Sequence, residues 1–203
     1  MNFMLITDTF PPLINGVSRT LQILATGLAK AGHSVEVITT VGGSCSHERV
    51  TITKVPSMPL PGYPGLRLGH ASRRFFEKRM SELRPDGLYV AVESLMGINA
   101  VSAARQLGIR VVTGFHTNFH SYSKDYRLPM LKGIAARYLR WFHNRAARTL
   151  TPSTTTADEL IGMGITSIGV MGRGVDADLF HPSKRDRVLR MMLGAGDDTP
   201  VAL

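Results

Sequence analysis

The amino-acid sequence predicts an α/β protein built around a doubly wound parallel sheet. Short runs rich in β-branched and apolar residues alternate with segments whose apolar residues recur at helical spacing. Glycines and prolines separate these runs, as they do between the elements of α/β units. The 203 residues are 43% hydrophobic and include 20 glycines and 11 prolines, a composition typical of a globular domain rather than a fibrous or disordered chain.

The elements can be placed in order along the chain. Strands are expected at residues 3–7, 34–40, 88–92, 110–115, 148–151 and 167–171. Helices are expected at residues 17–28, 71–83, 98–107, 128–146 and 154–163. Residues 41–70 are expected to be irregular, although they contain the β-rich run TITKV, because prolines and glycines interrupt the segment that follows it. The count of six or seven strands with helices between them predicts a Rossmann-like sheet.

Composition also limits the location and the partners. No run of about 18 apolar residues predicts a transmembrane helix, and the first residues lack the pattern of a secretory signal. With a single cysteine, Cys45, no internal disulfide is possible, so a cytoplasmic protein is expected. Lys and Arg number 24 against 15 Asp and Glu, and the net charge of +9 favours phosphate-bearing partners of any kind.

In a doubly wound sheet, ligands bind at the carboxyl ends of the strands, so the loops there are candidate sites. The first such loop, residues 8–17, ends in Asn15-Gly16-Val17 at the start of a helix. A glycine at that position lets backbone N–H groups approach an anion such as a phosphate. The alternative is a plain turn made by Asn15-Gly16. The loop is neither a P-loop nor a dinucleotide-binding fingerprint.

The second candidate loop carries His116, Asn118 and His120 after the expected strand 110–115. A histidine at the carboxyl end of a strand can orient or polarise a hydroxyl or carbonyl of a substrate, although a structural histidine is the alternative. His116 and His120 are four residues apart, but no third ligand accompanies them, so no metal site is expected.

Two further segments carry functional signals. Gly172-Arg173-Gly174 begins a loose match to a dinucleotide fingerprint, but Pro182 follows too soon for the helix that this motif needs. We interpret the match as a turn that leaves the last strand. The other segment is basic and contains two phenylalanines; it comprises Arg67, Arg73, Arg74, Phe75, Phe76, Lys78 and Arg79. It is either a helix that lies on an anionic membrane or an ordinary surface helix that packs its apolar side on the sheet.

These loops together resemble glycosyltransferase family 4, whose members have the GT-B fold of two Rossmann-like domains. The resemblance lies in five segments, in the family's order: TDTFPPLINGVSRTL, LRPDGLYVAVES, GFHTNFHSY, RYLRWFHNRAARTLTPSTTTADEL and GRGVDADLFHP. It covers nearly the whole chain to Pro182 and is strongest to bacterial α-mannosyltransferases and related enzymes that glycosylate lipids. Residues 93–97, Glu-Ser-Leu-Met-Gly, depart from the Glu-Gly-Pro-Leu-Gly of the similar enzymes.

The resemblance implies a retaining transferase that moves a hexose, with mannose favoured, from a nucleotide-sugar to a lipid or lipid-linked acceptor. His116 would act as the catalytic residue beside the transferred sugar. Residues implied to bind the donor are Asn15, Gly16, Val17, Asn118, Arg173 and Gly174. The basic segment that contains Arg73 and Arg79 would contact the acceptor or an anionic membrane on the inner face of the plasma membrane. The family needs no metal or cofactor, and GDP-mannose or a UDP-sugar is the donor.

The resemblance also implies a division of the chain. Residues 1–182 match the first, acceptor-side domain, and residues 183–203 match the linker and the start of the donor-binding domain, most of which is absent from this sequence. We therefore expect the isolated chain to transfer sugar poorly. The alternative is a truncated, non-catalytic domain that binds acceptor, membrane or a partner. Nucleic-acid binding is not expected, because only the net charge suggests it and no recognised motif supports it.

Overall fold

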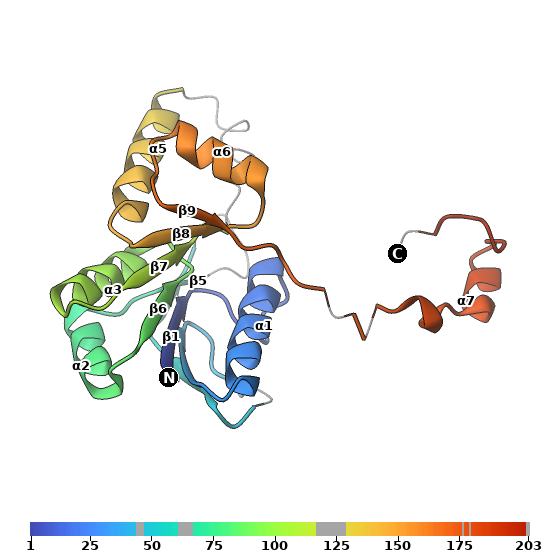
Figure 1. The fold of residues 1–203 in the computed structure, drawn as a ribbon, viewed down its shortest axis with the longest axis horizontal. Helices are drawn as coiled ribbons and strands as arrows, with labels where there is room; N and C mark the ends of the chain where they lie inside the picture. Colours follow the sequence, from blue (N-terminus) through green and yellow to red (C-terminus); the bar gives the residue numbers. More distant parts are fainter. Residues whose placement is uncertain (44–46, 61–66, 117–128, 176, 179, 202–203) are drawn as a thin grey trace. The chain divides into compact units, whose positions relative to one another are not determined.

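The fold is described from a computed structural model. The structure describes residues 1–43, 47–60, 67–116, 129–175, 177–178 and 180–201, apart from the side chains of 129–132. The chain divides into two compact units, Met1–Arg173 and Gly174–Leu203, so the boundary expected at residue 182 falls inside the second unit. The first unit contains the sheet and its helices (Figure 1).

The sheet of the first unit has seven parallel strands in the order β3-β2-β1-β6-β7-β8-β9. The strands are β1 (Asn2–Thr7), β2 (Ser34–Thr39), β3 (Val50–Lys54), β6 (Gly87–Val90), β7 (Val111–Gly114), β8 (Arg148–Thr151) and β9 (Ile168–Val170). The order runs outward in both directions from β1, which is the topology of a doubly wound sheet. The predicted fold class is confirmed.

The central strands β2, β1, β6 and β7 are mostly buried because helices cover both sides of the sheet (Figure 1). In β1, Met4 and Ile6 belong to the core cluster that includes α2 and α3, whereas Leu5 belongs to the cluster that includes α1. This alternation follows from the period of two residues in a strand.

The helices of the first unit begin and end on local signals. They are α1 (Gly16–Lys30), α2 (Arg73–Leu83), α3 (Leu95–Gln106), α5 (Pro129–His143) and α6 (Thr154–Gly162). Asn15, Ser72 and Ser153 cap α1, α2 and α6, each accepting a backbone N–H with its side chain. Gly32, two residues past α1, has φ +88°, a left-handed conformation that glycine adopts without strain.

The expectation that residues 41–70 are irregular was wrong in two places. The run TITKV forms most of β3, which pairs with β2 at the sheet edge. Further along, β4 (Ser57–Pro59) and β5 (Arg67–Gly69) form a separate antiparallel pair. The prolines do not prevent this pairing because Pro59 stands at the end of a strand, where no further ladder hydrogen bond is needed. The Arg67 side chain supports the pair through bonds to the hydroxyl and carbonyl oxygens of Ser57, at 2.8 and 2.7 Å.

The second unit contains the short 3₁₀ helix η1 (Pro182–Lys184) and the helix α7 (Arg187–Met192). Asp186 caps α7 by accepting the backbone N–H groups of Val188 and Leu189, at 2.8 and 3.1 Å. Among the described residues of the whole chain, no helix is both long enough and apolar enough to cross a membrane.

Candidate active site

The order of the strands reverses at β1, which has β2 on one side and β6 on the other. The loops that leave the carboxyl ends of such neighbouring strands form the crevice in which doubly wound folds bind ligands. Three titratable residues lie just past these ends: Asp8 after β1, Glu93 after β6 and His116 after β7. Their charges influence one another, since Glu93 acts on the pKa of both Asp8 and His116.

His116 is held by a hydrogen bond to a tyrosine of the neighbouring strand. The Tyr89 hydroxyl on β6 lies 2.8 Å from His116 Nε2, and the two rings meet edge to face. Gly114, two residues before His116, makes room for this contact. A Cβ at position 114 would overlap the Tyr89 hydroxyl and come within 2.6 Å of Nε2. The glycine therefore permits the approach of the two side chains.

Burial determines which atom of the pair carries the proton. Burial lowers the pKa of His116, and the positive charge of Arg173 lowers it further, whereas Glu93 raises it. Burial, followed by Glu93, raises the pKa of Tyr89 well above its usual value. At neutral pH a protonated phenol thus faces a neutral imidazole. The phenol donates to Nε2, which places the imidazole proton on Nδ1. Nδ1 is buried and has no hydrogen-bond partner among the described residues, so its proton is left unsatisfied there.

The amino end of α1 and the side chain of Arg173 lie close together. A Cβ added to Gly16, the first residue of α1, would lie 3.0 Å from Arg173 Nη1. The guanidinium therefore lies directly against the first turn of the helix, where backbone N–H groups and the helix dipole favour negative charge. Because Arg173 also acts on the pKa of His116, the structure brings Gly16, His116 and Arg173 together.

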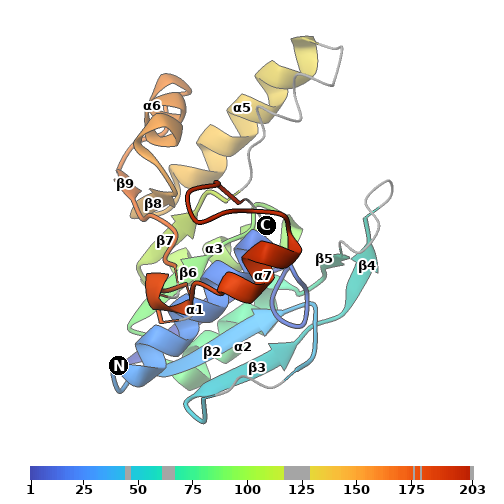
Figure 2. The same ribbon diagram turned by 90° about the vertical axis from the view of Figure 1, so that its right-hand side faces the viewer.

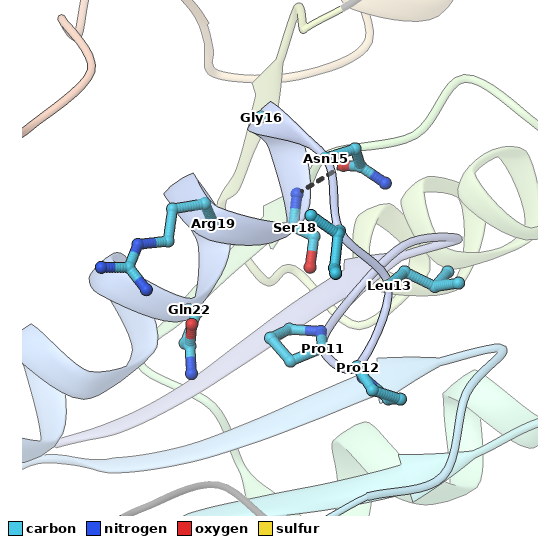
Figure 3. Close-up of a pocket in the computed structure, with 9 residues that line it drawn as sticks. Pro11, Pro12, Leu13, Asn15, Gly16, Ser18, Arg19 and Gln22 are labelled. Atoms are coloured by element: carbon cyan, nitrogen blue, oxygen red, sulfur yellow. Dashed lines mark hydrogen bonds between the residues drawn. The ribbon is translucent and has the colours of Figure 1, made fainter. Parts of the chain in front are cut away.

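A cavity of about 490 Å³ opens beside the first turns of α1 (Figure 3). It is lined by Pro11, Pro12, Leu13, Ile14, Asn15, Gly16, Ser18, Arg19 and Gln22. Figure 3 shows Arg19 and Gln22 projecting from the same side of α1, and the dashed line marks the bond from Ser18 N to Asn15 Oδ1 (2.8 Å). The volume lies within the range of small-molecule sites.

Asp8 links the end of β1 to the β4–β5 pair. Its Oδ1 accepts the backbone N–H of Gly69 at 2.8 Å, and its carbonyl oxygen accepts the Thr40 hydroxyl at 2.7 Å. Burial raises the pKa of Asp8 from 3.8 to about 6, against the opposing effect of the Gly69 hydrogen bond. A carboxyl group with this pKa changes its charge close to physiological pH.

Glu93 connects the crevice to a buried polar network. Its Oε1 lies 3.5 Å from Nε2 of His143, and its carbonyl oxygen accepts the Tyr138 hydroxyl, which comes from α5. The other imidazole nitrogen, His143 Nδ1, lies 2.9 Å from the Thr113 hydroxyl of β7. The network therefore fixes the carboxyl half of α5 against β7 and the loop that carries Glu93.

Other residues predicted to bind the donor have different positions. Asn15 caps α1, and its Nδ2 donates to the Thr9 hydroxyl at 2.7 Å, so its side chain is engaged within the loop. Val17 packs partly against the core cluster that includes α1. Asn118 lies outside the described residues, as does His120. Gly174 belongs to the second unit.

The predicted membrane segment on α2 needs one correction. Phe76 is fully buried in the core, so it cannot contact a membrane, and Phe75 is partly buried against the same cluster. The reason is the helical spacing, since Phe76 and Met80 share the side of α2 that covers the sheet. Three basic side chains of the segment form ion pairs: Arg73 with Glu77, Lys78 with Glu82, and Arg79 with Glu36 and Glu82.

Sequence reasoning did not assign roles to Asp8, Tyr89 or Glu93. The first and last stand in loops at strand ends, a position that could have indicated them. Tyr89 looks like an ordinary strand residue, and only the pairing of β6 with β7 places its hydroxyl at the imidazole. Among the described residues, no group of three or more His, Cys, Asp or Glu side chains could hold a metal ion. Independence from metal stays a prediction.

Comparison with known proteins identifies the family. The model of glycosyltransferase family 4 matches residues 14–179, most of the first unit and part of the second. The chain belongs to glycosyltransferase family 4. It is 33% identical over 192 residues to a GDP-mannose-dependent alpha-mannosyltransferase of Mycobacterium tuberculosis, a match that covers 92% of this chain and 50% of that protein. An alpha-monoglucosyldiacylglycerol synthase of Streptococcus pneumoniae is 29% identical over 79% of this chain and 37% of its own length.

Solved structures of GT-B proteins share the fold of this family-4 chain. Sucrose-phosphate synthase of Thermosynechococcus elongatus matches with a TM-score of 0.65 at 12% identity, over 97% of this chain and 53% of that one. WaaG, a glycosyltransferase involved in lipopolysaccharide biosynthesis, matches with a TM-score of 0.59 at 13% identity, over 96% and 52% of the two chains. The chain thus spans about half the length of the relatives that it matches.

Proposed function

We propose that this chain is the acceptor-side half of a retaining glycosyltransferase that moves mannose from GDP-mannose to a lipid or lipid-linked acceptor. The observation that carries the proposal is the grouping of Gly16, Arg173 and His116 at the carboxyl edge of the sheet. The curated relatives support the choice of sugar and acceptor, because they include GDP-mannose-dependent mannosyltransferases and glucosyldiacylglycerol synthases.

The arrangement suits the departure of a nucleoside diphosphate. When the bond from the anomeric carbon to the diphosphate breaks, both electrons stay on a phosphate oxygen, and negative charge develops there. The Arg173 guanidinium and the N–H groups at the start of α1 stabilise that charge, since fixed donors in a crevice act strongly on developing charge. The new bond forms from the acceptor oxygen to the same face of the sugar, and the acceptor proton passes to the departing phosphate.

His116 orients the sugar in this proposal. Its Nδ1–H, which is buried and has no partner among the described residues, bonds a sugar hydroxyl that comes to lie near the reacting carbon. The neutral imidazole also suits a positively charged transition state, because a second positive charge beside the sugar would destabilise it. Neither metal nor cofactor takes part, and the protein acts at the cytoplasmic side of a membrane.

An assay of transfer tests the proposal. The chain is joined after Leu203 to the half of the M. tuberculosis mannosyltransferase that it does not match, and labelled GDP-mannose is supplied with diacylglycerol or phosphatidylinositol vesicles. We expect labelled lipid with an α linkage from the fusion protein, and only background transfer from the 203-residue chain. Transfer by the chain alone at roughly 1 s⁻¹ or faster, a rate typical of whole enzymes, would contradict the proposal that this chain is only the acceptor-side half.

A further inference from the structure

The surface best suited to an anionic membrane is not the one predicted from the sequence. Three of the basic side chains of α2 are neutralised by glutamates, with the shortest pair, Arg79 Nη2 to Glu36 Oε1, at 2.5 Å. Phe76, one of the two phenylalanines of that segment, is fully buried. A helix whose charges are mostly paired and whose apolar side is mostly covered binds a bilayer weakly.

The outer side of α5 has the opposite character. The helix contains no acidic residue. Its exposed apolar side chains, Ile134 and Trp141, are 61% and 45% exposed. They are seven residues apart, about two helical turns, so they lie on the same side of the helix. Leu139 and Phe142 on the inner side are buried, so the core accounts for the inner side of α5 only.

Basic side chains surround the exposed tryptophan. A cavity of about 360 Å³ is lined by Arg137, Arg140, Trp141, Asn144 and Arg145. The Arg145 guanidinium lies 4.9 Å from the centre of the indole ring, a cation–π contact. Within the described part of the chain, none of these three arginines forms an ion pair with a carboxylate. Their charge is available to a partner.

We propose that this surface, which we call the α5 face (Ile134, Arg137, Arg140, Trp141 and Arg145), docks the protein on a bilayer of anionic phospholipid. The proposal rests on the proposed transfer to a lipid acceptor and names the surface that contacts the membrane. The arginines bind lipid phosphates at the headgroup level, where each basic side chain near an anionic surface contributes about 1 kcal/mol, or about fivefold in partitioning. The indole and the isoleucine enter the interface, the region that tryptophan prefers in membranes.

The composition of the α5 face favours a bilayer over a soluble anion. A soluble phosphate compound would need the arginines only, and it gives no role to an isoleucine that is 61% exposed. A membrane interface uses both kinds of side chain at once, as amphipathic helices show.

Docking through α5 would also be coupled to the candidate active site. On its inner side, the Tyr138 hydroxyl of α5 donates to the carbonyl oxygen of Glu93, in the loop at the carboxyl edge of the sheet. Figure 2 shows α5 extending past the carboxyl edge of the strands rather than lying flat along the sheet. A bilayer held by this helix is thus close to the edge where the acceptor must enter.

Trp141 makes the proposal directly testable, because it is the only tryptophan in the sequence. Its fluorescence therefore reports on the α5 face alone. We expect a blue shift of the emission when vesicles of phosphatidylcholine mixed with phosphatidylglycerol are added to the full chain, and quenching when the lipids carry bromine. Vesicles of phosphatidylcholine alone should leave the spectrum unchanged. Binding to anionic vesicles without a shift or quenching of Trp141 would overturn the assignment to α5.

Matched charge reversals separate the two helices. The double variant Arg137→Glu/Arg140→Glu on α5 should lower partitioning onto anionic vesicles by at least about 30-fold, the loss expected from two basic residues. Arg74→Glu/Lys78→Glu makes the same change of net charge on α2 and should retain most of the binding. Circular dichroism during thermal unfolding shows whether each variant is folded. The opposite ranking of two folded variants would contradict the proposal.

The outcomes also separate this proposal from the proposed function. If the wild-type chain shows no preference for anionic vesicles, the α5 face is not a membrane-docking surface. The release of GDP from GDP-mannose by the fusion protein, supplied with diacylglycerol dissolved in detergent and without any bilayer, then still reports on the transferase. If no GDP is released while Trp141 responds to anionic lipid, the α5 face is supported as the membrane surface and the proposed reaction is contradicted.

Discussion

At the scale of single residues, the pair Tyr89–His116 shows how burial sets the state of a site. The phenol has a raised pKa and the imidazole a lowered one, so the contact of 2.8 Å joins two neutral groups at physiological pH. A neutral imidazole carries one N–H proton. Because Nε2 accepts the hydrogen bond of the phenol, that proton is on Nδ1. The side chain thus presents a donor rather than an acceptor.

This arrangement predicts the tautomer of His116. In nitrogen NMR spectra of histidine-labelled protein at neutral pH, Nδ1 should resonate as the protonated nitrogen and Nε2 as the unprotonated one, and the ring should titrate below pH 6.5. The His116→Gln variant assigns the signals. In Tyr89→Phe the hydrogen bond is lost, and the tautomer preference should weaken while the pKa stays low, because burial is its main cause. A proton found on Nε2 in the wild type would contradict this account.

Asp8 predicts a pH-dependent stability. Its pKa of about 6 in the folded state exceeds the usual 3.8, so the folded state binds the proton more tightly than the unfolded state does. The stabilisation from the proton is complete below pH 3.8 and is lost as the pH rises through about 6. Asp8→Asn keeps an acceptor for the Gly69 N–H. At pH 8 its free energy of unfolding should therefore exceed that of the wild type by on the order of 2 kcal/mol.

The contrast between two pH values checks this prediction without reference to absolute stability. The advantage of Asp8→Asn in urea unfolding should shrink steadily as the pH falls from 8 to 5. An advantage that is the same at both values would mean that the carboxyl group does not titrate as described.

Some residues of the candidate site could be predicted from the sequence, and others could not. Gly16, His116 and Arg173 were predicted from their motifs, and the structure groups them. The partners of Tyr89 and Glu93 could not be predicted, because those partners are far away in the sequence. The hydroxyl of Tyr89 meets a histidine 27 residues later, and Glu93 Oε1 lies 3.5 Å from the imidazole of His143.

At the scale of elements, local signals predicted helices better than the edge strands. The caps Asn15, Ser72 and Ser153 lie next to the helices that they begin, so the sequence carries the signal locally. The run TITKV becomes a strand by pairing with β2, whose residues are 15 positions earlier, as in Val35↔Val50. The β4–β5 pair likewise depends on a partner across a segment rich in proline and glycine. Such pairing is not encoded within a short window.

Two glycines in different elements should respond in opposite ways to the same substitution. Gly114→Ala at the end of β7 places a methyl group on the Tyr89 hydroxyl, and we expect a loss of about 1–3 kcal/mol in the free energy of unfolding. Gly27→Ala in α1 meets no atom within 4 Å, and alanine favours the helix, so a gain of up to about 1 kcal/mol is expected. Urea unfolding of both variants measures the difference. Equal effects would show that the space around Gly114 is not restrictive.

At the scale of the whole molecule, the central claim is that the first unit supplies the histidine of a sugar-transferring crevice. The family, the parallel sheet and the position of His116 past β7 agree with one another. The net charge of +9 agrees with phosphate-bearing partners but distinguishes neither donor nor membrane. The claim therefore depends on the chemistry of one side chain within a working enzyme.

The most direct measurement compares three versions of the fusion protein, the unchanged one, His116→Ala and His33→Ala, for transfer of labelled mannose from GDP-mannose. His33 serves as the control because it lies at the amino end of β2, where it packs on Phe3, away from the carboxyl edge. We predict that His116→Ala lowers the rate of transfer by at least about 100-fold, the loss that misplacing a reacting group can cause, and that His33→Ala leaves it within about twofold. Transfer by His116→Ala at the rate of the unchanged fusion protein would contradict the central claim.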